Sequence, residues 1–184
     1  MRNNKNNKGF IQHYFFLKKK NSAGFTLIEL LIVIAIIAII AAVVFVALDP
    51  LTRFRDARDS RRWSDASALM SAIKVDQVDN GGAYLTAITN TTDDVVYMIG
   101  TATTGCDDAY DAGNCEVEVV ADTSCVDLSG LVTEGYIGSV PVSPNGAGTW
   151  TSSITGYTLT KASTGIITIQ ACESENSDPI SVSR

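Results

Sequence analysis

The stretch that decides the fold is LLIVIAIIAIIAAVVFVAL, residues 30–48, which runs for 19 residues without a charge or a proline. A helix of this length is about 28 Å long, close to the ~30 Å hydrocarbon core of a bilayer. The core helix of a soluble protein is seldom apolar on every side over such a length. The stretch therefore predicts one helix that spans a membrane.

The charged residues are segregated along the chain. All six charged side chains before residue 21 are basic, whereas residues 81–184 hold 13 acidic side chains and two basic ones. Because basic residues favour the cytoplasmic side of a span, we expect a cytoplasmic N-terminus and a distal part outside the cytoplasm. The acidic distal part also argues against a nucleic-acid-binding surface, since phosphate binding needs clustered Lys and Arg.

The chain has a single histidine, His13, which precedes the apolar stretch. The rest of the chain therefore cannot build a Ser-His-Asp triad, a Cys-His pair or a His-ligated metal site. An enzyme that uses carboxylates or Lys161 alone stays open, but the composition disfavours it.

A secretory signal peptide is the alternative to a membrane anchor. The apolar run is longer than the 7–15 residues typical of a signal peptide, and DPLTR, residues 49–53, is no small-x-small cleavage site. Glu29 also lies inside the apolar stretch that begins at Phe25, and the nearest downstream basic residue is Arg53. A carboxylate in such a stretch is costly and indicates a function.

The residues in front of the span resemble the processing site of type IV pilins and pseudopilins. KKKNSAG, residues 18–24, is followed by FTLIELLIV, residues 25–33. In that family a prepilin peptidase cuts after the glycine and methylates the new N-terminus. The resemblance implies a leader of residues 1–24, cleavage between Gly24 and Phe25, N-methylation of Phe25 and a role for Glu29 in filament assembly. The leader is longer here than in many members of the family.

The resemblance also implies an α+β pilin fold, in which a long N-terminal helix packs on a small antiparallel sheet. Residues 25–48 would form its transmembrane and filament-core half, residues 49–80 its amphipathic half, and residues 81–184 a β-rich head. Pro50 predicts a break after Asp49, with Asp49 as the N-cap of the second half. Asn80-Gly81-Gly82 predicts its end.

The second half has residues at helical spacing that predict one face of an amphipathic helix packed on the head, and all of them except Gln77 are apolar: Phe54, Ala57, Trp63, Ala66, Met70, Ile73 and Gln77. The arginine-rich stretch Arg53–Arg62 has two interpretations. The simpler one is a solvated face with ion pairs along the helix. The other is a surface that meets lipid headgroups before assembly, or acidic neighbours in a filament.

In the head, residues 95–99, 116–120, 156–161 and 166–171 have the pattern of short strands. Residues 162–165 lie between the last two and predict a hairpin turn. Residues 128–132 predict a short helical turn.

All four cysteines lie in the head: Cys106, Cys115, Cys125 and Cys172. Disulfides are permitted outside the cytoplasm, and the spacings contain no CxxC pair that would favour zinc. Four cysteines allow three connectivities. We predict Cys106–Cys115, which closes a short loop containing Gly113, and Cys125–Cys172, which ties down the C-terminal region as is common in the resembling family.

Asp107, Asp108 and Asp111 form an acidic cluster beside Cys106. Some pseudopilins bind calcium through loop carboxylates, so these residues are weak calcium candidates. A solvated acidic loop is the simpler interpretation, and no other cofactor is expected.

These features predict a structural protein and not an enzyme: a subunit of a type IV pilus or of a type II secretion-like pseudopilus. The partners implied by the resemblance are other pilin subunits, a prepilin peptidase, an inner-membrane assembly platform and, before assembly, the lipid bilayer. The precursor would sit in the inner membrane and the assembled subunit at the cell surface. The alternative is a permanently anchored extracytoplasmic binding or sensor domain, which would need neither Gly24-Phe25 nor Glu29.

Overall fold

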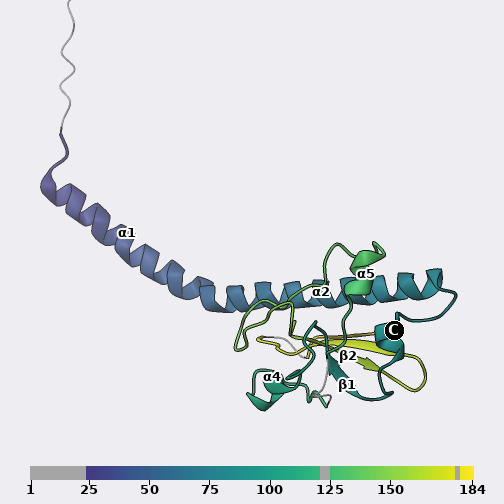
Figure 1. Ribbon diagram of the computed structural model, residues 1–184. Coiled ribbons are helices and arrows are strands. Elements are labelled where there is room, and N and C mark those ends of the chain that lie inside the picture. Colours follow the sequence, from purple (N-terminus) through teal and green to yellow (C-terminus); the bar gives the residue numbers. More distant parts are fainter. Residues whose placement is uncertain (1–23, 121–124, 177–178) are drawn as a thin grey trace, which may run out of the picture. The chain divides into compact units, whose positions relative to one another are not determined.

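The computed structural model describes residues 24–120, 125–176 and 179–184 (Figure 1). The predicted leader of residues 1–24 therefore lies outside the described residues except for Gly24. The chain divides into two compact units, Met1–Leu48 and Asp49–Arg184. The first unit contains helix α1, Leu27–Leu48, none of whose residues is buried. Within the described part of the chain, one helical stretch is long and apolar enough to cross a membrane.

The helix break predicted at Asp49-Pro50 is confirmed. Helix α1 ends at Leu48, Asp49 has a positive φ of 36°, and helix α2 runs over Pro50–Asp79. Asp49 occupies the N-cap position, but its carboxylate accepts a hydrogen bond from the Thr52 hydroxyl (2.6 Å) and none from the backbone N–H groups of the helix. At the other end, Gly81 takes the left-handed conformation (φ 67°) that terminates α2, as the sequence predicts.

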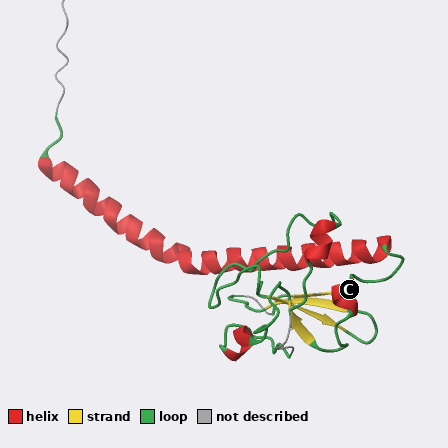
Figure 2. Cartoon of the chain, in the orientation of Figure 1, coloured by secondary structure: helices red, strands yellow, loops and turns green. Residues whose placement is uncertain are grey.

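Among the residues that the structure describes, the head adds a four-stranded sheet and three short helices to α2 (Figure 2). The strands are β1 (Val96–Met98), β2 (Tyr157–Lys161), β3 (Ile167–Ala171) and β4 (Ser181–Ser183), and the helices are α3 (Thr86–Thr89), α4 (Asp108–Asp111) and α5 (Ser129–Thr133). The sheet order is β1-β2-β3-β4, and each neighbouring pair is antiparallel. The predicted hairpin is β2–β3, with Gly165 in its turn at φ 85°.

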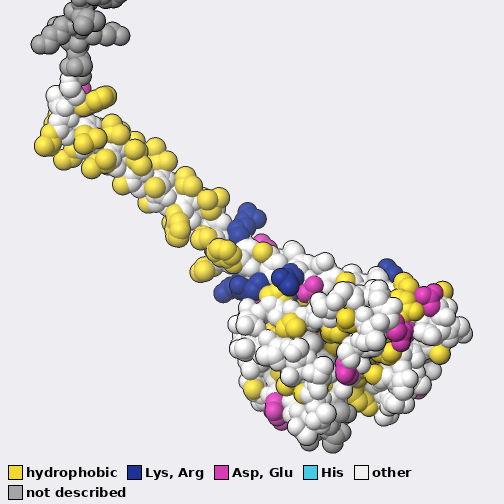
Figure 3. Space-filling view, turned by 45° about the horizontal axis from the view of Figure 1, so that its top comes forward, with side chains coloured by type: hydrophobic (Ala, Val, Ile, Leu, Met, Phe, Trp, Pro, Cys, Tyr) yellow, Lys and Arg dark blue, Asp and Glu magenta, His cyan; other side chains and the backbone are white. Residues whose placement is uncertain are grey.

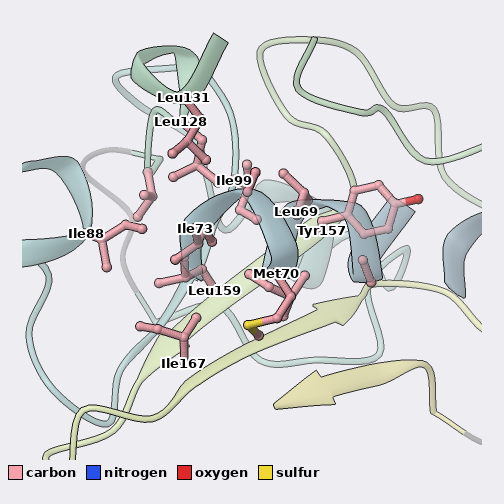
Figure 4. Packing of buried hydrophobic residues seen from close by; sticks show 14 of the residues in the cluster. Leu69, Met70, Ile73, Ile88, Ile99, Leu128, Leu131, Tyr157, Leu159 and Ile167 are labelled. Carbon is pink, nitrogen blue, oxygen red and sulfur yellow. The ribbon is translucent and has the colours of Figure 1, made fainter. Parts of the chain in front are cut away.

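The core lies between α2 and the sheet. Leu69, Met70 and Ile73 of α2 are fully buried, and Met70 and Ile73 lie on the side of Leu159 and Ile167 of the sheet (Figure 4). These apolar side chains recur every three or four residues on the helix and every two residues on the strands, so each element presents one apolar face. The result is the α+β, pilin-like layout expected from the sequence: a long N-terminal helical region and a small antiparallel sheet.

The face of α2 that packs on the head differs from the prediction in its first half. Ala66, Met70 and Ile73 are buried as expected, but Phe54 is 64% exposed and Trp63 is 41% exposed. Ala57 is also exposed. The prediction was wrong there because this part of α2 is attached through charged side chains and not through apolar ones.

The predicted strand at residues 116–120 is also wrong. No strand forms there, although Val119 is buried and Glu118 is exposed, so the alternation correctly indicated the inward and outward sides. The segment makes isolated backbone contacts, from Glu116 N to Cys172 O (2.8 Å) and from Val120 N to Val96 O (3.2 Å). Single hydrogen bonds of this kind do not make a ladder.

The four cysteines form disulfides, but the predicted pairing is wrong. The bonds join Cys106 to Cys125 and Cys115 to Cys172, with Cα–Cα distances of 5.5 and 4.3 Å. The hydrogen bond from Glu116 N to Cys172 O holds Cys115 at the end of β3. Helix α4 occupies the stretch between Cys106 and Cys115, where the prediction assumed a simple turn.

Candidate processing and assembly site

The predicted cleavage site lies directly before α1. Gly24, Phe25 and Thr26 precede the first helical residue, Leu27, and Phe25 is 90% exposed. A Cβ atom added at Gly24 would meet nothing within 4 Å. The fold therefore has no need for a glycine at this position, and a requirement for it has to come from outside the folded chain.

Thr26 and Glu29 form a capping box at the start of α1. The backbone N–H and the hydroxyl of Thr26 each donate to Glu29 Oε2 at 2.8 Å. In return, the Glu29 backbone N–H donates to Thr26 Oγ1 at 3.3 Å. This reciprocal arrangement satisfies two backbone N–H groups that a helix N-terminus otherwise leaves unpaired.

Glu29 thus has a partner in its own chain that our sequence analysis missed. This partner is the polar Thr26 and not a basic residue. The signal was present in the sequence, since Thr26-Leu27-Ile28-Glu29 fits the [Ser/Thr]-x-x-Glu pattern of a capping box. Any assembly contact made by the Glu29 carboxylate has to compete with these hydrogen bonds.

Arg62 is the centre of a buried ion-pair cluster on α2. Its guanidinium is fully buried and pairs with Asp59 (2.8 Å), Glu173 (2.8 Å) and Glu175 (2.9 Å). It also donates to Ser143 Oγ (3.1 Å) and to the Pro144 carbonyl (2.9 Å). Burial of an arginine is tolerable only when all its donors are used in this way.

The carboxylates of the cluster connect it to the C-terminal segment and to a loop. Glu173 accepts hydrogen bonds from Gly148 N and from Trp150 Nε1, and Glu175 pairs with Arg58. Asp59 accepts from the backbone N–H of Glu175 at 3.0 Å. Arg58 and Arg62 therefore do not form a solvated face, and the segment 173–176 is held against the first half of α2.

The pKa values of two glutamates are shifted in opposite directions. The hydrogen bond from Arg58 lowers the pKa of Glu175 below its usual 4.5, and Arg62 acts in the same direction. Desolvation raises the pKa of Glu134, with the neighbouring Asp76 acting in the same sense.

Burial and the adjacent Asp65 carboxylate raise the pKa of Tyr157, whose hydroxyl donates to Asp65 Oδ2 at 2.9 Å.

The calcium candidates lie around α4, with Asp107 at its N-cap position and Asp108 and Asp111 within it. Among the residues that the structure describes, no group of three or more His, Cys, Asp or Glu side chains could hold a metal ion. Calcium binding at this cluster stays a prediction.

Comparison with known proteins places a family signature on the N-terminal region. Neither the search of curated proteins nor the search of solved structures found a match. The family model of the prokaryotic N-terminal methylation motif matches residues 19–45, which include Gly24, Phe25 and Glu29. With the apolar helix behind it, this signal fits a membrane-anchored precursor. Residues 19–45 thus carry the class III prepilin signal of type IV pilins and pseudopilins.

Proposed function

We propose that this chain is the precursor of a pilin-like structural subunit, cleaved between Gly24 and Phe25 and polymerised through α1 into a type IV pilus or a secretion pseudopilus. The observation that carries the proposal is the order of elements at the N-terminus. A glycine that the fold does not need precedes Phe25, and a capped carboxylate follows at the start of an otherwise uncharged helix. A simple membrane anchor requires none of these features.

The proposed assembly step uses the charge that cleavage creates. Removal of residues 1–24 exposes the amine of Phe25, and the nearest downstream cation is Arg53, 24 residues from Glu29. In staggered parallel helices, the Phe25 amine of one subunit can pair with Glu29 of the next. Low dielectric strengthens such a pair, so it would set the register while the apolar surface of α1 supplies cohesion. This chain supplies the contact and performs no catalysis.

Processing is tested by mass spectrometry of material sheared from the cell surface. We expect a mature chain of 160 residues that begins with Phe25, and an uncut, membrane-retained precursor for Gly24→Val. Gly138→Val is the matched control, because a Cβ at Gly138 also meets nothing within 4 Å. A different mature N-terminus would refute the proposed cleavage site. A chain that stays wholly in the membrane fraction would favour the anchored sensor.

Assembly is tested with Glu29→Gln and Glu29→Ala in the same shearing experiment. We expect normal insertion and cleavage for both variants but loss of incorporation into filaments. Glu118→Gln, which neutralises an exposed carboxylate in the head, should assemble normally. Wild-type incorporation of both Glu29 variants would show that the carboxylate does not direct assembly.

A further inference from the structure

The arginines in the first half of α2 fall into two groups. Arg58 and Arg62 are engaged with carboxylates of the head. Arg53 and Arg55 are exposed, and neither forms an ion pair with any carboxylate in the described part of the chain. Figure 3 shows basic side chains gathered over the beginning of α2. In the described part of the chain, no ion pair with the head therefore depends on the charges of Arg53 and Arg55.

Apolar side chains lie beside these two arginines. Leu51 is 68% exposed and Phe54 is 64% exposed, although both lie on a helix that buries other apolar residues further along. Exposed apolar side chains next to arginines are typical of helices at a membrane interface, where the apolar groups reach the acyl boundary and the charged groups face phosphate. The segment Leu51–Arg55 thus combines exposed apolar and basic side chains, as is typical of a helix at a membrane interface.

Chain connectivity places this segment close to the bilayer surface. Helix α1 ends at Leu48, and Arg53 follows five positions later, which limits the Cα–Cα distance between Leu48 and Arg53 to about 18 Å. The headgroup layer extends roughly 5–8 Å beyond the hydrocarbon core on each side. Because Pro50 to Arg53 is helical, the Cα atoms of Leu48 and Arg53 are closer together than this limit. The length of the arginine side chain allows its guanidinium to reach back to the headgroup layer.

Two carboxylates, Asp49 and Asp56, flank the segment, and both have partners. Asp49 accepts a hydrogen bond from the Thr52 hydroxyl (2.6 Å), and Asp56 accepts one from Asn176 Nδ2 (3.1 Å). Arg53 and Arg55 act on Asp49 electrostatically, but neither guanidinium forms an ion pair within 4.0 Å in the described part of the chain. A guanidinium presents a planar fork that matches phosphate oxygens, which makes an anionic lipid headgroup the complementary ligand.

We propose that Arg53 and Arg55 bind the phosphates of anionic lipids in the leaflet where α1 emerges, while Leu51 and Phe54 enter the acyl boundary. The binding fixes the depth of the subunit in the membrane. Cleavage, which belongs to the proposed function, would remove all six basic residues of the leader and leave Arg53 as the first basic side chain of the mature chain. After processing, Arg53 and Arg55 then become the basic residues that hold the subunit before assembly.

The test uses the full chain with a photoreactive diazirine phenylalanine at position 54. The protein is reconstituted in vesicles of phosphatidylethanolamine and phosphatidylglycerol at about four to one, and the crosslinked lipids are identified by mass spectrometry. A probe at position 54 reports only on its own leaflet, so anionic lipids bound by the leader on the other side do not contribute. We expect the ratio of phosphatidylglycerol to phosphatidylethanolamine adducts to exceed the bulk lipid ratio about fivefold.

Three variants sharpen the result. R53Q/R55Q should bring the adducts down to the bulk lipid ratio, R53K/R55K should keep the excess because the charge is retained, and R184Q should keep it because Arg184 lies at the far end of the chain. Adducts at the bulk ratio in the wild type, no lipid adducts, or crosslinks to the acidic head of another copy would each overturn the proposal. The assay needs no peptidase and no filament, so its failure would leave the proposed function standing.

Discussion

At the scale of single residues, Arg62 is the side chain on which the attachment of α2 depends most. It is fully buried and contacts three carboxylates, so Arg62→Met would leave Asp59, Glu173 and Glu175 without their shared cation. Breaking a buried ion pair on one side typically costs about 3–5 kcal/mol. We expect a loss of this size in the free energy of unfolding of the head, measured by urea titration of the full chain in detergent with the fluorescence of buried Trp150 as the signal.

Arg61→Met is the matched control for this measurement. The Arg61 side chain is 67% exposed and lies 3.6 Å from Asp65, so its removal should cost no more than about 1 kcal/mol. Equal losses for the two variants would mean that the buried cluster contributes nothing beyond a surface ion pair.

The two shifted glutamates predict opposite responses to pH. The pKa of Glu175 is lowered in the folded state, so its contribution to stability is present above the unfolded value of 4.5 and is lost as the pH falls through the folded value. The pKa of Glu134 is raised, so its contribution is present below 4.5 and is lost as the pH rises through the folded value. We expect Glu175→Gln to flatten the acid limb of the stability curve.

Glu134→Gln should act at the other end of the pH range. It removes a carboxylate that is destabilising when ionised, so the variant should be more stable than the wild type at pH 7 and no more stable at pH 4. The urea midpoints of the two variants against pH give both results in one experiment. Parallel curves for the wild type and both variants would contradict the assigned shifts.

At the scale of elements, α2 has two halves with different chemistry. From Ala66 to Ile73 it contributes apolar side chains to the core, whereas at Arg58–Arg62 it contributes charges that bind the C-terminal segment. The apolar half could be predicted because its period is local. The polar half could not, because Arg62 and Glu175 are 113 residues apart and no local pattern pairs them.

The disulfides can be checked directly because the described pairing differs from the one the sequence suggested. The only Lys and Arg after Lys74 are Lys161 and Arg184, so trypsin leaves Cys106, Cys115 and Cys125 in one peptide. Digestion with Asp-N under non-reducing conditions cuts before Asp111 and Asp122 and separates these three cysteines. We expect crosslinked peptides that join Cys106 to Cys125 and Cys115 to Cys172.

Removal of the two disulfide bonds, one at a time, should lower the stability of the head by different amounts. The bonds close loops with sequence separations of 19 and 57 residues, for which chain entropy gives about 3 and 4 kcal/mol. Replacing Cys115 and Cys172 together by serine should therefore lower the urea midpoint more than replacing Cys106 and Cys125. In the Asp-N digest, a crosslinked peptide that joins Cys106 to Cys115 would contradict the pairing in the structure and support the pairing predicted from the sequence.

At the scale of the whole molecule, the signals that predicted structure correctly were local ones. A proline after the apolar run predicted the break at Asp49, and a glycine-containing turn predicted the β2–β3 hairpin. The disulfide pairing failed because it depends on which distant segments the tertiary structure brings together. Strand β4 was missed because it is only three residues long, Ser181–Ser183, and its side chains are mostly polar.

The charge of the whole subunit leads to a prediction about filaments. The formal charge of the chain is −6, and the proposed removal of residues 1–24 would take away six basic side chains and no acidic one, which would leave a subunit with a formal side-chain charge of −12. Residues 81–184 hold 13 of the acidic side chains and only two basic ones, so packed heads repel one another. The Debye length falls from about 30 Å at 0.01 M salt to about 8 Å at 0.15 M, which screens this repulsion.

We therefore expect filaments to be more stable at moderate salt than at low salt. The contact between Phe25 and Glu29 would lie in an apolar, poorly screened environment and should hold at both concentrations. The measurement is the fraction of sheared filament that sediments after incubation at about 0.01 M and about 0.15 M NaCl. Glu118→Lys, at an exposed head position, should reduce the difference. Filaments that dissociate as salt rises would show instead that attraction between exposed charges holds the subunits together.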